Sequence, residues 1–265
     1  MRNMKKWIVL ASVLLVIGAM GSVITFASSG SSSISESAEF SGEDVEKLDV
    51  ELNNQKLIIE PSQSSEMFVE LEGKGNNPEK SRLQAEMRDD TVHINVSQPD
   101  KKMVRFMDWG DRLTLTIYLP KKEYASIRLD VANGKIDAEQ FHAKDIMATA
   151  NNGEIEMYDI LSDKIEVESN NGKIVLDHVE GELNGETNNG AISLVTESLD
   201  RPMQLNSNNG KIKIETNQEP TNVTFDVRVD NGKIDMFDDS DWDTVIGDGE
   251  HRIKLTTHNG SITVE

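Results

Sequence analysis

A four-residue pattern, Asn-Gly-X-Ile, occurs seven times in the second half of this chain and constrains its fold more than any other feature. Its Asn-Gly pairs are Asn133-Gly134, Asn152-Gly153, Asn171-Gly172, Asn189-Gly190, Asn209-Gly210, Asn231-Gly232 and Asn259-Gly260. Successive glycines are separated by 19, 19, 18, 20, 22 and 28 residues. One Asn-Gly pair indicates only a turn, but a series at nearly constant spacing predicts a stack of similar units.

Apolar residues recur at fixed distances from these turns. The isoleucines two positions after the glycines are Ile136, Ile155, Ile174, Ile192, Ile212, Ile234 and Ile262. The apolar residues seven positions before the glycines are Ile127, Ile146, Ile165, Leu183, Met203, Phe225 and Ile253. Side chains two positions apart on a strand lie on one face, and most of the residues between the apolar ones are polar. Each unit is therefore predicted to contain half-buried strands.

Two arrangements of such strands compete. An Asn-Gly turn can close an antiparallel hairpin, because both residues tolerate positive φ. Stacked coils, however, would place the same residue class at the same offset in every unit, because each coil lies on the previous one. The recurring offsets favour a β-solenoid, in which the longer last two intervals are surface insertions.

The turn residues have a structural explanation in such a stack. Stacked asparagines can share side-chain amide hydrogen bonds, and glycine adopts backbone angles closed to other residues. We therefore expect the asparagines and glycines of the seven turns to be structural and not ligand-binding.

Residues 39–120 are β-rich but less regular. Alternating or apolar runs predict strands at residues 48–52, 57–59, 68–71, 92–96 and 113–119. Residues 53–57 look like a degenerate copy of the repeat with Gln55 in the glycine position. The expected fold is thus all-β, a solenoid or β-roll of about seven coils at residues 121–265 with an N-terminal β cap at 39–120.

The N-terminal sequence predicts attachment to a membrane. Residues 1–6 are short and basic, and Trp7–Phe26 is a run of 20 residues without a charge, long enough to cross a bilayer core of roughly 30 Å. The positive-inside rule leaves residues 1–6 in the cytoplasm and the remainder outside. A cleaved signal peptide is the alternative, although such apolar regions are usually shorter. Residues 27–38, rich in Ser and Gly, are expected to be a flexible linker.

Composition excludes several classes of function. The chain has 27 Lys and Arg against 47 Asp and Glu, a formal charge of −20. Affinity for nucleic acid comes mainly from clustered basic residues, so no nucleic-acid partner is expected. The chain has no cysteine, which excludes disulfides, thiolate metal sites and cysteine nucleophiles.

One acidic segment has the spacing of a calcium site. Counted from Asp239, the acids Asp239, Asp241, Asp243 and Glu250 occupy positions 1, 3, 5 and 12, as the oxygen ligands of a helical calcium loop do. Thr244 stands where that loop has glycine, and strands are expected on both sides. A solvated acidic insertion and a weak Ca²⁺ site are therefore both open, and no other cofactor is expected.

Motifs for catalysis are missing. The chain contains no Gly-X-Ser-X-Gly elbow, no phosphate-binding glycine loop and no zinc-binding histidine pair. Asp137 and Glu156 share one offset and are expected about one coil apart, near the separation of a retaining glycosidase pair. Two solvated acids of neighbouring coils explain them better.

The serial turns, the short basic start with its anchor, Leu119-Pro120 and the run Tyr124–Leu129 resemble the bacterial "putative adhesin" β-strand-repeat family of unknown function. That family includes LiaG-like membrane-anchored envelope proteins. The resemblance covers roughly residues 40–265 and implies an envelope protein with a solenoid-like exodomain, associated with envelope-stress systems. It carries over no catalytic residue.

The sequence therefore predicts a non-enzymatic, single-pass membrane protein held by Trp7–Phe26. Its C-terminal domain would contact an envelope component or a membrane protein. The alternative function is that of a β-solenoid enzyme acting on a surface polysaccharide.

Overall fold

The computed structural model describes residues 24–25, 33–74, 82–97, 112–237 and 244–265. Within these residues the chain forms strands: β1 (Ile24–Thr25), β2 (Ser33–Ser41), β3 (Lys47–Leu52), β4 (Lys56–Pro61), β5 (Glu66–Lys74), β6 (Arg82–Arg88), β7 (Thr91–Ser97), β8 (Arg112–Leu119), β9 (Glu123–Val131), β10 (Ile136–Glu139), β11 (His142–Ala150), β12 (Ile155–Ser169), β13 (Ile174–Asn189), β14 (Ile192–Thr196), β15 (Met203–Asn209), β16 (Ile212–Thr216), β17 (Val223–Met236), β18 (Val245–Ile246) and β19 (His251–Val264). No helix in the described ranges is long and apolar enough to cross a membrane.

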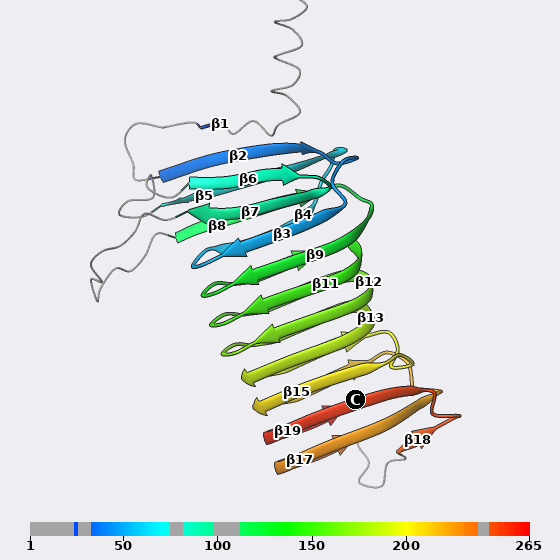
Figure 1. Ribbon diagram of the computed structural model, residues 1–265. Helices are drawn as coiled ribbons and strands as arrows, with labels where there is room; N and C mark the ends of the chain where they lie inside the picture. Colours follow the sequence, from blue (N-terminus) through cyan, green and yellow to red (C-terminus); the bar gives the residue numbers. More distant parts are fainter. Residues whose placement is uncertain (1–23, 26–32, 75–81, 98–111, 238–243) are drawn as a thin grey trace, which may run out of the picture.

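The strands form a stack with two rows, which Figure 1 shows from one side. We define row A as β6, β7, β3, β9 and β11, then residues 161–169 of β12 and 183–189 of β13, then β15 and the first halves of β19 and β17. Row B runs through β2, β5, β8, β4 and β10, the first residues of β12 and β13, then β14, β16 and the second halves of β19 and β17. Each Asn-Gly turn carries the chain from row A to row B.

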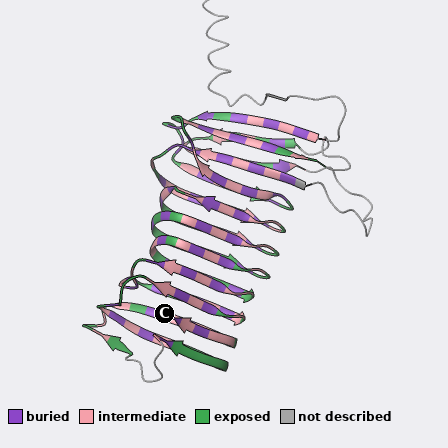
Figure 2. Cartoon of the chain, turned by 180° about the vertical axis from the view of Figure 1, so that it is seen from behind, coloured by how far each residue is buried: buried purple, intermediate pink, exposed green. Residues whose placement is uncertain are grey.

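The pairing between units confirms the solenoid and excludes the hairpin alternative. Ile136 pairs with Ile155 and Ile155 with Ile174, in both cases between parallel strands. Parallel neighbours arise because the chain returns to the same side of the stack after each coil. Figure 2 shows the resulting alternation of buried and half-exposed residues along the strands.

The predicted apolar rows line the interior. Six of the seven isoleucines that follow the turns are completely buried, whereas Ile234 keeps 41% of its surface exposed. The residues seven positions before the glycines are all buried as well. One continuous apolar core therefore extends along the described stack, with its weakest point at Ile234.

The last two coils stack in the reverse of their sequence order. We number coils 1 to 7 by their turn glycines, Gly134, Gly153, Gly172, Gly190, Gly210, Gly232 and Gly260. Asn209 of coil 5 pairs with Asn259 of coil 7, which in turn pairs with Asn231 of coil 6. The expectation that every coil lies on the previous one is thus wrong at this end. The longer intervals accommodate this crossing. The chain first forms coil 6 at the end of the stack and then returns to form coil 7 between coils 5 and 6.

The N-terminal strands continue both rows before the topology changes. β3 pairs in parallel with β9 and β4 with β10, so residues 47–61 form one further coil. Gln55 replaces glycine there, and its side-chain oxygen accepts hydrogen bonds from the backbone N–H groups of Asn53 and Asn54, each at 3.0 Å. Beyond this coil, β6 pairs antiparallel with β7, and β5 antiparallel with β8 and β2.

The N-terminal predictions meet the structure only in part. The anchor Trp7–Phe26 lies outside the described residues except for Ile24–Thr25, which pair antiparallel with β2. The expectation of a flexible linker over residues 27–38 is wrong from Ser33 onward, because Ser33–Ser41 form β2. Ile34, Glu36, Ala38 and Phe40 alternate into the interior there, and burial of this alternating face holds the segment in the sheet.

Candidate functional site

The seven predicted turns form a continuous ladder of asparagine amides. The Nδ2 of Asn152 donates to Oδ1 of Asn133 at 2.7 Å, and that of Asn171 to Oδ1 of Asn152 at 2.9 Å. The same bond joins Asn189 to Asn171, Asn209 to Asn189, Asn259 to Asn209, Asn231 to Asn259, and Asn133 to Asn54. Each amide between the two ends of the ladder, Asn54 and Asn231, thus uses one donor and one acceptor within the stack.

Close stacking, and not a left-handed backbone, requires the turn glycines. The described glycines with positive φ are Gly181, Gly232, Gly247 and Gly249, so the expectation of special backbone angles is wrong for six of the seven turns. A Cβ on Gly172 would lie 1.8 Å from the carbonyl oxygen of Gly153, and one on Gly190 would lie 1.9 Å from that of Gly172. No side chain fits at such distances.

A second amide ladder and a row of buried hydroxyls were not anticipated. One residue before the first ladder, Asn170 donates to Asn151, Asn188 to Asn170 and Asn208 to Asn188. Three residues before the glycine, Ser169, Thr187, Ser207 and Thr257 donate to the glycine carbonyl of the adjacent coil at 3.0–3.2 Å. Both rows have constant offsets from Gly, so the repeat alignment contains the signal that would have found them.

The predicted calcium segment lies mostly outside the described residues. Asp239, Asp241 and Asp243 fall in the range 238–243, which is not described. Glu250 is exposed, and its Oε2 accepts a hydrogen bond from Nδ2 of Asn222 at 3.1 Å, while its backbone N–H donates to Oδ1 of Asn222. Among the described residues no group of three or more His, Asp or Glu side chains could hold a metal ion.

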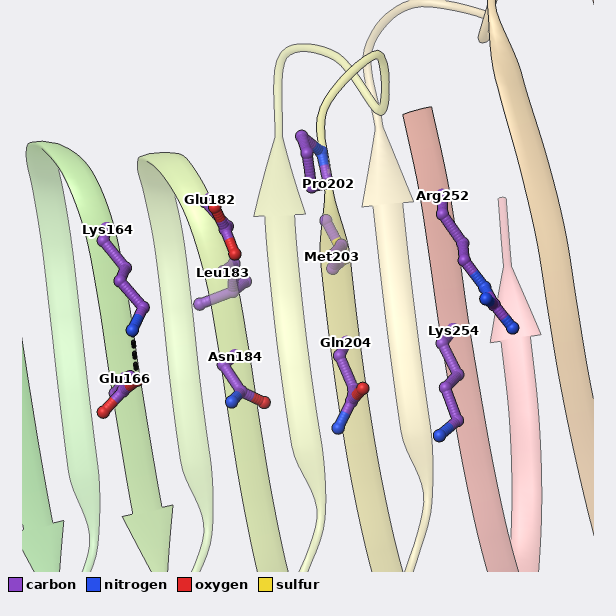
Figure 3. Close-up of a pocket in the computed structure, with 10 residues that line it drawn as sticks. All are labelled: Lys164, Glu166, Glu182, Leu183, Asn184, Pro202, Met203, Gln204, Arg252 and Lys254. Atoms are coloured by element: carbon purple, nitrogen blue, oxygen red, sulfur yellow. Dashed lines mark ion pairs between the residues drawn. The ribbon is translucent and has the colours of Figure 1, made fainter. Parts of the chain in front are cut away.

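A shallow depression on the outer surface of row A is a candidate binding site. It has a volume of about 390 Å³ and extends over β12, β13, β15 and β19. Figure 3 shows its side chains projecting from four neighbouring strands. Leu183 and Met203, both buried, lie beneath it. The hollow forms where Asn184 and Gln204 lie between the longer side chains of Lys164 and Lys254.

The parallel register aligns these side chains in a line across the strands. Asn184 pairs with Gln204 and Gln204 with Lys254. At a strand spacing of about 4.8 Å, the three residues span roughly 10 Å. Two amides and one ammonium group therefore face solvent side by side, which suits hydroxyl, carboxylate or phosphate groups of a ligand.

The charges around this line differ in how far they are neutralised. Lys164 lies 2.6 Å from Oε1 of Glu166, and Arg252 lies 2.7 Å from Oδ2 of Asp226. The pKa of Asp226 is lowered mainly by its hydrogen bond from Arg252. Lys254 makes no ion pair with any residue that the structure describes, so it retains its charge for a ligand.

Asp137 and Glu156 pair directly on adjacent coils, as their shared offset predicts. Both are held by lysines: Lys135 lies 2.5 Å from Glu156, and Lys56 lies 3.0 Å from Asp137. Burial raises the pKa of Glu156, but hydrogen bonds from Lys135 and Tyr158 outweigh it and leave the pKa below its ordinary value. A glycosidase acid needs the opposite shift, so the pKa of Glu156 does not suit it to be the protonated member of such a pair.

These features define a class of protein: an all-β repeat scaffold that presents an open polar surface. The chain belongs to the Toastrack DUF4097 family, whose model matches residues 45–180 and again residues 140–265. The two overlapping matches cover the repeat region and the strands that precede it. No curated protein matches the chain.

Solved structures of low sequence identity resemble this chain. A "putative cell adhesion protein" from Clostridium sporogenes is 17% identical, with 88% of this chain and 98% of that chain covered and a TM-score of 0.43. A "putative adhesin" from Bacteroides fragilis is 13% identical, with 87% and 97% covered and a TM-score of 0.39. A "putative lipid binding protein" from Parabacteroides distasonis is 11% identical, with 87% and 94% covered and a TM-score of 0.40.

Proposed function

We propose that this chain is a non-enzymatic, adhesin-like envelope protein that binds an acidic, hydroxyl-rich polymer of the envelope through the depression on row A. The observation that carries the proposal is the line of Asn184, Gln204 and Lys254, with the ammonium group of Lys254 unpaired among the described residues. An uncommitted cation is notable in a chain of formal charge −20. What distinguishes Lys254 from other lysines without an ion pair, such as Lys173, is its place beside the amides of Asn184 and Gln204 in the depression, where it attracts an anionic group.

The shape of the site favours a polymer over a small molecule. Small ligands are usually enclosed in concave, mostly apolar pockets. Here the lining residues are largely polar and lie on the outer face of four parallel strands. Such a surface can bind several successive groups of a chain laid across the strands, each through one or two hydrogen bonds.

Sedimentation with isolated cell-wall sacculi tests this proposal. The full chain in detergent is mixed with sacculi that retain their anionic polymers or have been stripped of them. We expect saturable binding that depends on these polymers, and we expect Lys254→Glu to weaken it about tenfold or more, because an attraction becomes a repulsion. Lys173→Glu is the matched control, since Lys173 is exposed on a turn and forms no ion pair with described residues.

Each other outcome of this experiment has a defined meaning. Equal losses in the two variants would show a non-specific charge effect and would contradict a site at Lys254. Absence of binding to both kinds of sacculi would overturn the polymer-binding function. Binding that requires added Ca²⁺ would instead implicate the segment Asp239–Glu250 or bridging of acidic surfaces by the cation.

Membrane anchoring through Trp7–Phe26 is part of the proposal. Its support is the uncharged length of that segment and the three basic residues before it. In this orientation the β-stack is extracytoplasmic, so protease added to intact spheroplasts should degrade it. Deletion of Trp7–Phe26 should release the protein from the membrane fraction, and protection of the β-stack from protease would contradict the orientation.

A role beside membrane signalling proteins rests on the resemblance to LiaG-like envelope proteins. Co-purification from membranes, with and without the Trp7–Phe26 segment, would locate such a contact. Loss of the partner on deletion would place the contact in the membrane segment. Retention would place it in the β-stack.

Polysaccharide hydrolysis is the alternative function, and the Asp137–Glu156 pair argues against it. Lys135 lies 2.5 Å from Glu156, whose pKa is below its ordinary value, and Lys56 lies 3.0 Å from Asp137. Release of reducing ends from wall polysaccharide, abolished by Glu156→Gln, would be needed to favour the enzyme.

A further inference from the structure

The stack ends at β17, which has an incompletely paired edge. One side of β17 pairs with β19 along residues 223–236. On the other side, β18 pairs with Val223 and Thr224, and Thr244 accepts a hydrogen bond from the N–H of Phe225. From Asp226 onward no described strand pairs with this edge. Figure 2 shows the end of the stack as largely exposed.

The side chains of this edge belong to the apolar interior. Val227 and Val229 are only partly buried and Ile234 is 41% exposed. Their counterparts in β19, Leu255, Thr257 and Ile262, are at most 1% exposed because β17 covers them. Val227, Val229 and Ile234 occupy the same interior positions in β17, but no further described coil covers them.

The backbone of the edge is oriented for pairing. The N–H of Phe225 points away from β19, since it donates to Thr244. Backbone groups alternate sides along a strand, so the N–H and C=O groups of Val227 and Val229 face the same open side. An unpaired row of this kind is a template for another strand.

The other end of the stack is closed in a different way. There β2 of row B and β6 of row A are joined by Glu36, whose Oε2 accepts a hydrogen bond from the N–H of Leu83 at 2.6 Å. Strands near this end run antiparallel. This end therefore does not offer β17 a parallel coil of the kind that the repeat stack uses, whereas a second β17 edge offers the same open backbone and apolar positions.

The charges on β17 are complementary to their own copy. Arg228 and Asp230 flank Val229, and Lys233 and Asp235 flank Ile234. In an antiparallel pair centred on Val229, Arg228 of one chain faces Asp230 of the other. A pair centred on Ile234 likewise places Lys233 opposite Asp235. Val229 lies two residues before Asn231, and Ile234 lies two residues after Gly232, so the two residues are equally far from the turn. One two-fold axis perpendicular to both rows can therefore pass through the centre of the Val229 pair and the centre of the Ile234 pair.

We propose that β17 is a homodimer surface, on which two copies of this chain join end to end by antiparallel pairing about Val229 and Ile234. The dimer pairs the open backbone, covers Val227, Val229 and Ile234, and places opposite charges at four cross-chain positions. No third copy can add through β17, because the isologous contact uses the β17 edges of both copies. The opposite ends of the two stacks then point away from each other.

Site-specific cross-linking tests the geometry. The chain has no cysteine, so single-cysteine variants of the full chain in detergent report one position each. We expect Ile234→Cys and Val229→Cys to form covalent dimers with a short thiol-reactive cross-linker, because residues at the centre of an antiparallel pair lie about 5.5 Å apart. Lys173→Cys, exposed on a turn in the middle of the stack, should remain monomeric.

Charge reversal tests the pairing without disturbing the interior. Asp230→Lys places like charges opposite each other, so the dimer Kd measured by sedimentation equilibrium should rise about tenfold or more. The double variant Arg228→Asp, Asp230→Arg should restore dimerisation. A monomeric full chain, a dimer that cross-links at Lys173→Cys and not at Ile234→Cys, or a double variant as weak as the single one would each overturn the proposal.

Discussion

Three residue types hold the turns of coils 3, 4, 5 and 7 on their neighbours. The glycine permits the approach of two backbones, a hydroxyl three residues earlier satisfies the glycine carbonyl, and the asparagine amides bond along the outside. The hydroxyls are buried, with Thr187 and Ser207 at most 1% exposed. A buried carbonyl without a partner is costly, so each of these four hydroxyls stabilises the stack. The row is less complete than the glycine row, because Val131, Ala150 and Val229 occupy the same offset in coils 1, 2 and 6.

Gly172→Ala should destabilise the fold by about 3 kcal/mol, because its Cβ meets the carbonyl of Gly153 and the hydroxyl of Ser169. Urea unfolding measures this loss. Lys173→Ala, one residue further on in the same turn and exposed, is the control and should change the free energy of unfolding by less than about 0.5 kcal/mol. Equal stability of the two variants would contradict the steric role of the glycine.

Thr187→Val should cost about 1–2 kcal/mol, since it preserves the shape of the side chain and removes the hydrogen bond from Oγ1 to the carbonyl of Gly172. Thr187→Ser retains the hydroxyl and loses a methyl group. If the hydrogen bond is the dominant contribution, urea unfolding will find the serine variant more stable than the valine variant. The reverse order would assign the stabilisation to packing.

His178 is the residue whose protonation is most clearly linked to the fold. Its Nδ1 lies 2.6 Å from Asp177 and its Nε2 lies 3.3 Å from Glu197. The hydrogen bond to Asp177, with Glu197 adding to it, raises the pKa of His178 above its ordinary value near 6.5. Its contribution to stability is therefore complete below that value and is lost as pH rises through the higher folded pKa.

An NMR titration of the His178 ring should give a pKa above 6.5. Asp177→Asn should bring it down toward the ordinary value. Asp163→Asn, an exposed acid at another corner, should leave it unchanged. A pKa at or below 6.5 in the unaltered protein would contradict the ion pairs of His178 with Asp177 and Glu197.

At the scale of elements, the reversed order of coils 6 and 7 gives β19 a central position. It pairs with β15 and β16 on one side and with β17 on the other. β17 itself contacts the stack through β19, with only the short β18 beside it. Coil 6 therefore joins the other coils through coil 7, whereas coil 7 also packs on coil 5.

Two deletions should separate these dependencies. Removal of residues 251–265 takes away β19, so amide hydrogens of Val223–Met236 should exchange rapidly. Replacing residues 217–250 with a six-residue linker, the length that joins β14 to β15, removes coil 6 and leaves coil 7 on coil 5. That variant should keep slow exchange in β15 and β19, and fast exchange throughout both would contradict the stacking order.

The sequence predicted the repeating part of the fold because each coil repeats the same local chemistry. The offsets of Ile155 and Ile174 are enough to place them on one interior row. The order of the last coils could not be predicted, because the offsets around Gly232 and Gly260 are the same in either order. Only the interval lengths differ, and they were interpreted as insertions.

The candidate site escaped prediction for another physical reason. Asn184, Gln204 and Lys254 occupy outward positions, which the interior pattern leaves unrestricted. Lys254 comes next to Gln204 only because coil 7 precedes coil 6 in the stack. Asp137 and Glu156, by contrast, lie on consecutive coils and were predicted as neighbours correctly.

At the scale of the whole molecule, the charge of −20 opposes compaction. Raising NaCl from about 10 mM to about 150 mM shortens the screening length from roughly 30 Å to roughly 8 Å. The free energy of unfolding should therefore rise with salt, by an amount on the order of 1 kcal/mol. Urea titrations at several salt concentrations measure it, with equimolar sucrose as the uncharged control. A fall in stability would mean that screened local ion pairs outweigh the net repulsion.

The interior position of β19 also fixes the order of events in biosynthesis. A repeat stack can usually be laid down as the polypeptide emerges, each new coil docking on a finished one. Here coils 1 to 5 can follow that rule, but coil 6 emerges before the surface that receives it exists. Its apolar strand has no partner until β19, which follows it in the sequence, has been made. Synthesis of β19 is thus the step that allows coil 6 to join the stack.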